Sequence, residues 1–176
     1  MTGQGIHRKK SHQLFRVNNM RLWSIHPKYY DDSALARCIG EGLGGLRALC
    51  GLQKMHRNHP QLERFKKAAF CKHVFAEYIY CCHSESLVRE KAYNFDFEVM
   101  YDYLEGAVEG VKLPVTTGQI QYECKLLLAK MRSRNKGGKA TQYIELLEAD
   151  IKANQVELHP LFYSVPGPVE SWEKLK

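Results

Sequence analysis

The most informative stretch of the sequence is Met20-Arg21-Leu22-Trp23-Ser24-Ile25-His26-Pro27-Lys28-Tyr29-Tyr30-Asp31-Asp32. It precedes a segment of helical periodicity that contains Glu41. The stretch reads like the beginning of a protein, although nineteen residues come before it. Those nineteen residues are rich in Gly, Ser, Asn and basic residues and show no apolar periodicity. We therefore expect a flexible basic arm over residues 1–19 and one folded domain over residues 20–176.

The segment after this stretch is predicted to be a helix from about Ser33 to Cys50, with Asp31, Asp32 or Ser33 as its N-cap. Apolar residues recur at helical spacing along it, namely Leu35, Ile39, Leu43, Leu46 and Leu49. Glu41 lies two positions from its apolar neighbours and so points away from this stripe.

The predicted helix contains four glycines around Glu41, at positions 40, 42, 44 and 45. Each glycine in a helix interior costs about 0.8–1 kcal/mol relative to alanine. Two explanations remain open at this point. Either something large approaches the backbone beside Glu41, or the helix is weak or kinked.

The rest of the chain also has helical patterns, and no segment is a convincing strand. Helices are predicted from about residue 66 or 68 to 89, within 93–109 starting near residue 95 or 96, from 116 or 117 to about 134, and over about 140–153. The last should bury Tyr143, Ile144, Leu147 and Ile151. Three prolines between residues 158 and 172 exclude a long helix there. We predict a mainly α protein: a single compact helical domain, monomeric, with the N-terminal segment packed among the helices and an irregular Pro-rich C-terminal tail.

Composition narrows the functional class. The 176 residues are 44% hydrophobic and contain no run of eighteen apolar residues, so we expect no membrane span. The six cysteines form no CxxC pair and no zinc spacing, which predicts reduced thiols in an intracellular protein and no metal site. The net charge of +7 favours a nucleic-acid partner, since basic residues that neutralise phosphates release counterions.

Four stretches, in matching order, resemble the bacterial members of the pyrimidine dimer DNA glycosylase family, the family of the phage endonuclease V. They are Met20 to Tyr29; Arg57-Asn58-His59-Pro60-Gln61-Leu62-Glu63-Arg64-Phe65; Gly118-Gln119-Ile120-Gln121-Tyr122-Glu123 with Leu127-Leu128-Ala129-Lys130; and His159-Pro160-Leu161-Phe162 with Val165-Pro166-Gly167-Pro168-Val169-Glu170-Ser171-Trp172-Glu173. The resemblance implies a DNA repair glycosylase and AP lyase that acts on UV-induced pyrimidine dimers in duplex DNA, without a cofactor or metal.

The resemblance also implies catalytic residues. Met20 occupies the place of the nucleophile, whose α-amine attacks the sugar carbon bearing the damaged base if Met20 is the mature N-terminus. An α-amine has a reference pKa near 7.7–8.0, far below that of lysine, so it is readily neutral. Glu41, twenty-one positions on, matches the acid–base glutamate. Arg21 matches the arginine beside the nucleophile, which contacts phosphate. If the arm stays attached, Lys28 or another lysine would have to serve, or the protein would be inactive.

The residues expected to contact DNA are Arg21, His26, Arg37, Arg57, His59, Lys130, Arg132 and Arg134. Arg37 is included because Gly40 stands where the family usually has an arginine, and Arg37 is available one turn earlier. The alternative for His26 and His59 is local hydrogen bonding in loops. The alternative for the basic cluster from Lys130 to Arg134 is a solvated helix face.

Two other function classes remain open from the sequence. One is a non-catalytic DNA-binding homologue, which would bind DNA with a steep salt dependence but would not cut it. The other is a scaffold or interaction protein in which the basic charge only confers solubility, and which would fail to bind DNA at low salt.

Overall fold

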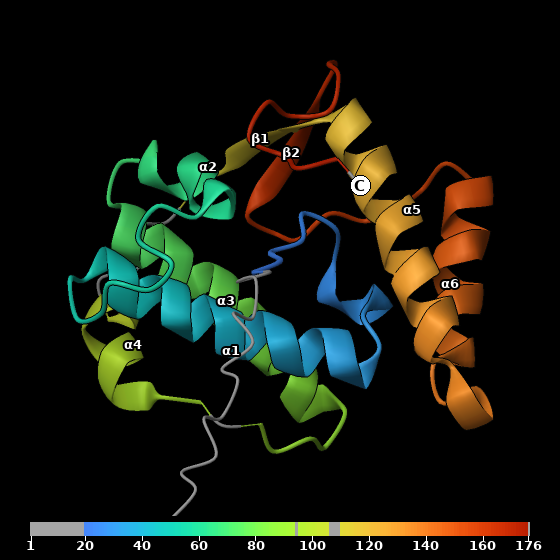
Figure 1. The fold of residues 1–176 in the computed structure, drawn as a ribbon, viewed down its shortest axis with the longest axis horizontal. Helices are drawn as coiled ribbons and strands as arrows, with labels where there is room; N and C mark the ends of the chain where they lie inside the picture. The colour runs from blue at the N-terminus through green and yellow to red at the C-terminus, as the bar shows by residue number, and fades with distance from the viewer. Residues whose placement is uncertain (1–19, 94, 106–109, 176) are drawn as a thin grey trace, which may run out of the picture.

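The computed structural model describes residues 20–93, 95–105 and 110–175, so the predicted basic arm over residues 1–19 lies outside it. Six helices dominate this part of the chain: α1 (Asp32–Leu49), α2 (Glu63–Lys66), α3 (Cys71–Val88), α4 (Phe97–Leu104), α5 (Thr117–Arg134) and α6 (Thr141–Lys152). Short 3-10 turns occur at Pro27–Tyr29, Pro60–Leu62 and Lys136–Gly138. The prediction of a mainly α domain is confirmed (Figure 1).

Helix α1 begins as the sequence indicated, because the side chain of Asp31 accepts a hydrogen bond from the backbone N–H of Ala34 at 3.1 Å. An N-cap of this kind satisfies one of the free donors in the first turn of a helix. The start of α5 follows the same rule, with Thr116 accepting from the N–H of Gln119. Both predicted helix starts are therefore correct within one or two residues.

The glycines of α1 allow α3 to pack against it. A Cβ atom on Gly42 would lie 2.8 Å from Ile79, and one on Gly45 would lie 2.9 Å from Phe75, both fully buried side chains of α3. Gly40, by contrast, has no atom within 4 Å of the place of its missing Cβ. Between the two explanations left open by the sequence, the structure supports close approach: a neighbouring helix lies against a regular α1.

A short parallel sheet corrects the prediction that the chain has no strand. Strand β1 (Leu113–Thr116) pairs with β2 (Phe162–Val165), in the register Leu113 to Phe162 and Thr116 to Val165. Each strand has only four residues, and they lie far apart in the sequence, so neither carries a periodic signal of its own. The Pro-rich tail is thereby fixed to the body of the protein.

Three further expectations need correction. The helix expected from residue 66 or 68 to 89 begins only at Cys71, because Phe70 has a left-handed backbone (φ 54°) immediately before α3, and the short α2 precedes it as a separate helix. Helix α6 buries only Leu147 fully, since Ile151 is 41% exposed at the end of a helix on the flank of the domain. Tyr143 and Ile144 pack against the core while only partly buried.

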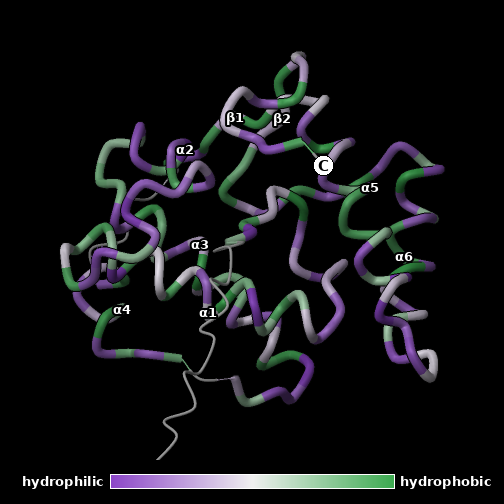
Figure 2. Tube along the Cα trace, in the orientation of Figure 1, coloured by the Kyte–Doolittle hydropathy of each residue, from purple (hydrophilic) through white to green (hydrophobic). Residues whose placement is uncertain are grey.

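The N-terminal segment runs through the middle of the domain, between the α1–α3 pair and α5 (Figure 1). Its residues Leu22, Ile25, Tyr29 and Tyr30 are fully buried. The predicted packing of this segment among the helices is thus confirmed. Apolar residues are spread over all six helices and not collected in one long element (Figure 2). None of the helices described has the length and apolar content needed to cross a membrane.

Candidate active site

Side chains bind the backbone N–H groups of Arg21, Trp23 and Ser24, and the tail adds one backbone hydrogen bond, from the N–H of His159 to the carbonyl of Ser24 at 2.8 Å. The N–H of Arg21 donates to Glu41 of α1 at 2.7 Å. The hydroxyl of Tyr78, from α3, accepts from the N–H of Trp23 at 2.8 Å and donates to its carbonyl at 2.9 Å. The N–H of Ser24 donates to Glu123 of α5 at 2.5 Å. Buried backbone polar groups must find partners, and here three helices supply them.

Glu41 of α1 lies beside the start of this segment, and each oxygen of its carboxylate accepts one hydrogen bond. Its Oε2 accepts the N–H of Arg21, and its Oε1 accepts from the guanidinium of Arg37, one turn earlier in α1, at 2.9 Å. The Glu41 side chain is 21% exposed. The carboxylate is therefore fixed in orientation and still reachable from solvent.

A cavity of about 40 Å³ opens beside Glu41. The side chains that line it come from the N-terminal segment, α1 and α5, namely Arg21, Trp23, Ala34, Arg37, Glu41, Lys130 and Arg134. The structure thus brings together five of the residues predicted from the sequence. One carboxylate surrounded by four basic side chains suits a site that handles an anionic substrate.

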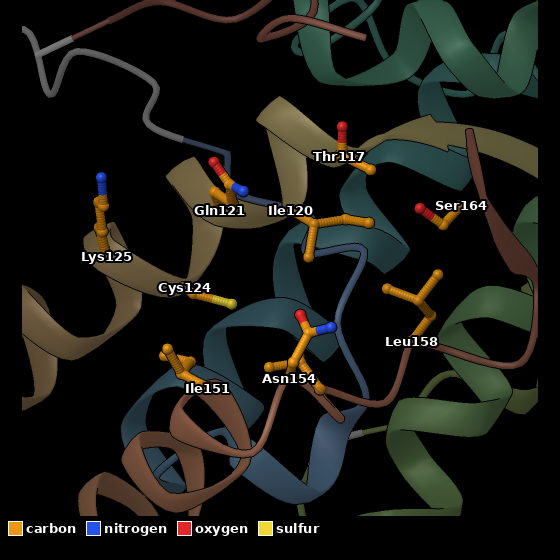
Figure 3. Close-up of a pocket in the computed structure, with 10 residues that line it drawn as sticks. Thr117, Ile120, Gln121, Cys124, Lys125, Ile151, Asn154, Leu158 and Ser164 are labelled. Atoms are coloured by element: carbon orange, nitrogen blue, oxygen red, sulfur yellow. The ribbon is translucent and has the colours of Figure 1, made fainter. Parts of the chain in front are cut away.

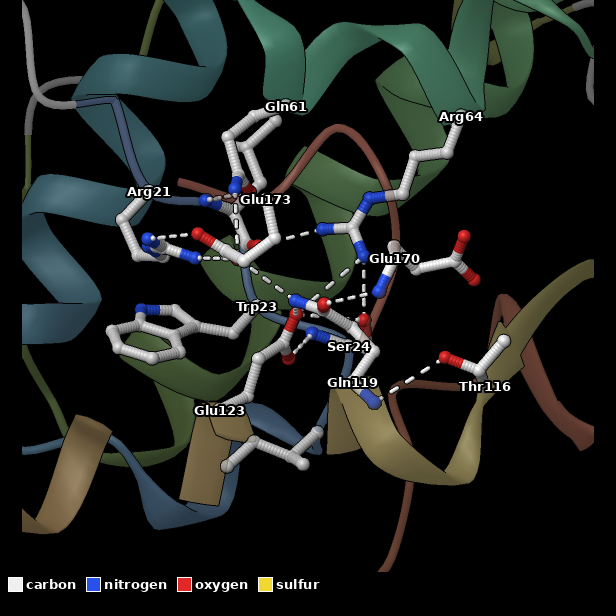
Figure 4. Close-up of polar contacts among 12 residues, drawn as sticks. Arg21, Trp23, Ser24, Gln61, Arg64, Thr116, Gln119, Glu123, Glu170 and Glu173 are labelled. Carbon is white, nitrogen blue, oxygen red and sulfur yellow. Dashed lines mark hydrogen bonds and ion pairs between the residues drawn. The ribbon is translucent and has the colours of Figure 1, made fainter. Parts of the chain in front are cut away.

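The guanidinium of Arg21 points into the protein (Figure 4). It forms a two-pronged ion pair with Glu173 in the C-terminal tail, with nitrogen–oxygen distances of 2.5 and 2.8 Å. Burial alone would lower the pKa of Arg21, but the hydrogen bonds and charge of Glu173 outweigh it and raise the pKa. For Glu173, burial acts to raise the pKa, and the Arg21 contact lowers it overall. The predicted phosphate contact of Arg21 stays a prediction, and its visible partner is Glu173.

A second buried carboxylate, Glu123, lies in the same network. Besides Ser24 it accepts from Gln119 at 3.0 Å, and Arg64 lies 3.7 Å away. Glu123 is fully buried, and this burial raises its pKa despite the nearby cation of Arg64. Arg64 donates to the hydroxyl of Ser24 and to the carbonyl of Leu22, while its Nε has no partner within the described structure.

The remaining predicted DNA contacts lie elsewhere. The ring nitrogen Nδ1 of His26 accepts from the N–H of Lys28 at 3.0 Å, and that of His59 accepts from Gln61 at 3.2 Å. Both histidines thus cap 3-10 turns, which agrees with the local alternative. Arg57 is exposed and lines a different cavity, beside the end of α1.

In the basic cluster at the end of α5, Arg132 forms a surface ion pair with Glu148. Arg134 forms a two-pronged contact with Asp31 at 2.5 and 2.6 Å. Because Asp31 also caps α1, this contact ties the end of α5 to the start of α1. Arg134 is thus part of the framework as well as of the cavity wall.

His56 is a residue near the site that the sequence did not indicate. Its backbone is left-handed (φ 71°), a conformation that is uncommon for residues other than glycine. Its ring lies against Gly44, three positions after Glu41, at 3.3 Å from where a Cβ would be. Its buried Nδ1 has no hydrogen-bond partner in the described residues. Burial lowers the pKa of His56, against the opposing charge of Glu41.

Sequence reasoning also missed the buried charges Arg64, Glu123 and Glu173, although all three stand in the stretches that carried the family resemblance. A signal was present for α5. Gln119 and Glu123 fall on the same row of the helix as Leu127, at i, i+4 and i+8, and all three are fully buried. Polar residues on an apolar row mark a buried polar network.

A larger cavity, of about 370 Å³, lies between α5, α6 and the tail (Figure 3). Its lining is mainly apolar, with Cys124 at its wall, and includes no Asp, Glu or His among the described residues. Burial raises the pKa of Cys124 to about 12, so this thiol is a poor nucleophile. Among the residues that the structure describes, no three His, Cys, Asp or Glu side chains are grouped to hold a metal ion.

Comparison with known proteins gives one family match, over less than half of the chain. A family model described as pyrimidine dimer DNA glycosylase matches residues 20–100, a range that includes Met20, Arg21 and Glu41. The family is the one that the sequence stretches resembled, so this prediction is confirmed. The stretches that begin at Gly118 and His159 lie beyond the matched range. No curated protein and no solved structure matched the chain.

Proposed function

We propose, from the match of residues 20–100 to the pyrimidine dimer DNA glycosylase family, that this protein removes UV-damaged pyrimidines from duplex DNA and then cuts the strand as an AP lyase. The proposed nucleophile is the α-amine of a chain that begins at Met20. Glu41 is the proposed acid–base residue.

The hydrogen bond from the Arg21 N–H to Glu41, at 2.7 Å, is the observation that carries this proposal. Only three covalent bonds separate the backbone nitrogen of Met20 from that of Arg21, so the two nitrogens lie within about 4 Å of each other. An amine at residue 20 would therefore lie beside the Glu41 carboxylate. The buried side chain of Met20, 3% exposed, helps to hold this position.

The reaction follows from these two groups. The neutral amine attacks the sugar carbon that bears the damaged base, a carbon–nitrogen bond forms, and the base leaves with its bonding electrons and a proton. Loss of the amine proton and opening of the sugar ring give an imine. The imine acidifies the neighbouring sugar carbon, and removal of that proton expels the 3′ phosphate. Glu41 stabilises the cationic sugar and transfers these protons.

The surrounding charges suit DNA. Arg37, Lys130 and Arg134 line the cavity with Glu41 and are the proposed phosphate contacts. The substrate would expose its lesion by flipping a nucleotide out of the stack, since the sugar carbon is not accessible in a regular duplex.

A second candidate function follows from one observation. In the 176-residue chain the nitrogen of Met20 belongs to a peptide bond, because nineteen residues precede it, and a peptide nitrogen is not a nucleophile. If those residues stay attached, the same surface would make a DNA-binding protein that does not cut.

The decisive experiment is borohydride trapping on UV-irradiated duplex DNA with two forms of the protein, the whole chain and one that begins at Met20. A covalent adduct establishes the imine, and an adduct from the shorter form alone shows that residues 1–19 block the amine. If both folded forms give none, the non-catalytic alternative is favoured.

Glu41→Gln tests the role of the carboxylate. It should abolish strand cutting while leaving DNA affinity within a few-fold, because glutamine can still accept the Arg21 N–H. The exposed Glu145→Gln is the matched control, since it removes the same charge outside the site and should cut normally. Unchanged cutting by the Glu41 variant would remove this residue from the mechanism.

A further inference from the structure

Glu173 is a charged residue of the C-terminal tail that is almost fully enclosed. Its side chain is 1% exposed. It accepts four hydrogen bonds, at 2.5 and 2.8 Å from the guanidinium of Arg21, at 2.9 Å from Gln119 and at 3.4 Å from Gln61. Three of these bonds reach Oε2 and one reaches Oε1, so protein donors hold both oxygens of the carboxylate. Glu173 is thus held rigidly, and it holds Arg21 in turn.

Two carboxylates fix the residue beside the proposed nucleophile. Glu41 binds the backbone N–H of Arg21, and Glu173 binds its guanidinium. The first contact holds only the backbone of residue 21. The second comes from another direction and from a residue 152 positions away in the chain. Together with the buried Met20 side chain and the bound backbone of Trp23 and Ser24, they fix where the nitrogen of residue 20 lies relative to Glu41.

Glu173 also sets the charge balance around that nitrogen. The ionisable side chains around this region come from every element packed against it, namely Arg21 from the N-terminal segment, Asp31 before α1, Arg37 and Glu41 from α1, His56 from the loop after α1, Tyr122, Glu123, Lys130 and Arg134 from α5, and Glu173 from the tail. The charge of Arg21 is neutralised by Glu173 at contact distance. Without that partner, an uncompensated cation would stand one residue from the amine and disfavour its protonation.

We propose that Glu173 is a positioning residue, through which the C-terminal tail orients Arg21 and holds the N-terminal amine in register with Glu41. This inference rests on the proposed imine chemistry but concerns a segment outside residues 20–100, the range that matches the family. Glu173 is not itself a catalytic residue, because its buried carboxylate is occupied by protein donors.

The test compares Glu173→Gln and Glu173→Asp in whichever form gives the borohydride adduct, and also in the form that begins at Met20. That form retains every residue that the structure describes, including all the described core residues. Glu170→Gln is the matched control, since it removes a charge from the same tail without touching Arg21.

Two quantities are measured. The first is the single-turnover rate of imine trapping, compared with the Kd for the same UV-damaged duplex. Glu173→Gln should slow trapping by about tenfold or more with Kd within a few-fold, because misplacement of a reacting group by a fraction of an ångström is costly. The second is the pKa of the α-amine, measured by NMR after ¹³C labelling of the N-terminus. It should fall by roughly one unit in Glu173→Gln and stay unchanged in Glu173→Asp, which keeps the charge.

The outcomes separate this inference from the proposed function. Trapping by the unaltered protein, with unchanged rate and amine pKa in both variants, overturns the role of Glu173 and leaves the glycosylase proposal intact. No trapping by any form, with the amine pKa still dependent on Glu173, overturns the glycosylase proposal while supporting the coupling of the tail to residue 20. If Glu173→Gln does not fold, Glu173→Asp decides alone: slower trapping at unchanged amine pKa supports the inference, and unchanged trapping contradicts it.

Discussion

Replacing Tyr78 by phenylalanine would remove one oxygen atom from the centre of the domain. That oxygen is buried, accepts from the N–H of Trp23 at 2.8 Å and donates to the carbonyl of the same residue at 2.9 Å. Phenylalanine fills nearly the same volume, so no cavity forms. Two buried backbone groups are left without partners, and each such group costs about 1–3 kcal/mol. We therefore expect a loss of about 2–6 kcal/mol in the free energy of unfolding.

Urea unfolding measures this loss, with Tyr163→Phe as the matched control. Tyr163 is 47% exposed, and its replacement should change stability by less than about 0.5 kcal/mol. The slope of the unfolding free energy against urea concentration should be the same in the unaltered protein and both variants, so that the shift in midpoint reports the change in stability. A Tyr78 variant as stable as the control would refute the claim that side chains hold the N-terminal segment in place.

Three further predictions concern helix packing, pH and DNA binding. Gly45→Ala should destabilise the protein by roughly 1–2 kcal/mol, because its methyl group would meet the ring of Phe75. In Gly40→Ala the added methyl group would have no neighbouring atom within 4 Å, so this variant should stabilise the protein by about 0.8–1 kcal/mol in the same urea unfolding assay. Burial lowers the pKa of His159 to about 3 from an ordinary 6.5, so the unfolded chain takes up that proton first as the pH falls. The stability that neutral His159 provides should be complete above pH 6.5 and decline by about 1.4 kcal/mol per pH unit toward pH 3. His159→Gln should flatten the pH dependence of urea unfolding by about one proton, and an unchanged dependence would contradict the assignment. Lys130→Ala should reduce the slope of log affinity for duplex DNA against log salt by about 0.9, measured by fluorescence anisotropy. An unchanged slope would place the DNA elsewhere.

The helices could be predicted because their signals are local. A capping side chain and an apolar stripe lie within one turn or a few turns of each other, as with Asp31 before α1 and Thr116 before α5. The β1–β2 pair could not be predicted in this way. Leu113 and Phe162, which are paired in it, are separated in the sequence by the whole of α5 and α6, and neither strand is long enough to show alternation.

Part of the candidate site could be predicted from the family resemblance, whereas the helices were predicted from local sequence patterns. The proximity of Arg21 to Glu41 followed from the family resemblance and is now visible as a hydrogen bond. The ion pair of Arg21 with Glu173 could not be foreseen, because a sequence shows charge but not burial. From the sequence, Arg21 is expected to contact phosphate, and only the structure shows that its guanidinium is paired with the buried carboxylate of Glu173.

The separation of Arg21 and Glu173 also has a consequence for the order of events during synthesis. The two residues are 152 positions apart, so the pair cannot form until almost the whole domain has been made. At typical elongation rates this takes about 8–30 s after Arg21 is added. Helices α1 and α3 can pair well before then, but the nascent chain holds an unpaired arginine at its centre. The helices can therefore begin to pack during synthesis, and the contact of Glu173 with Arg21 forms last.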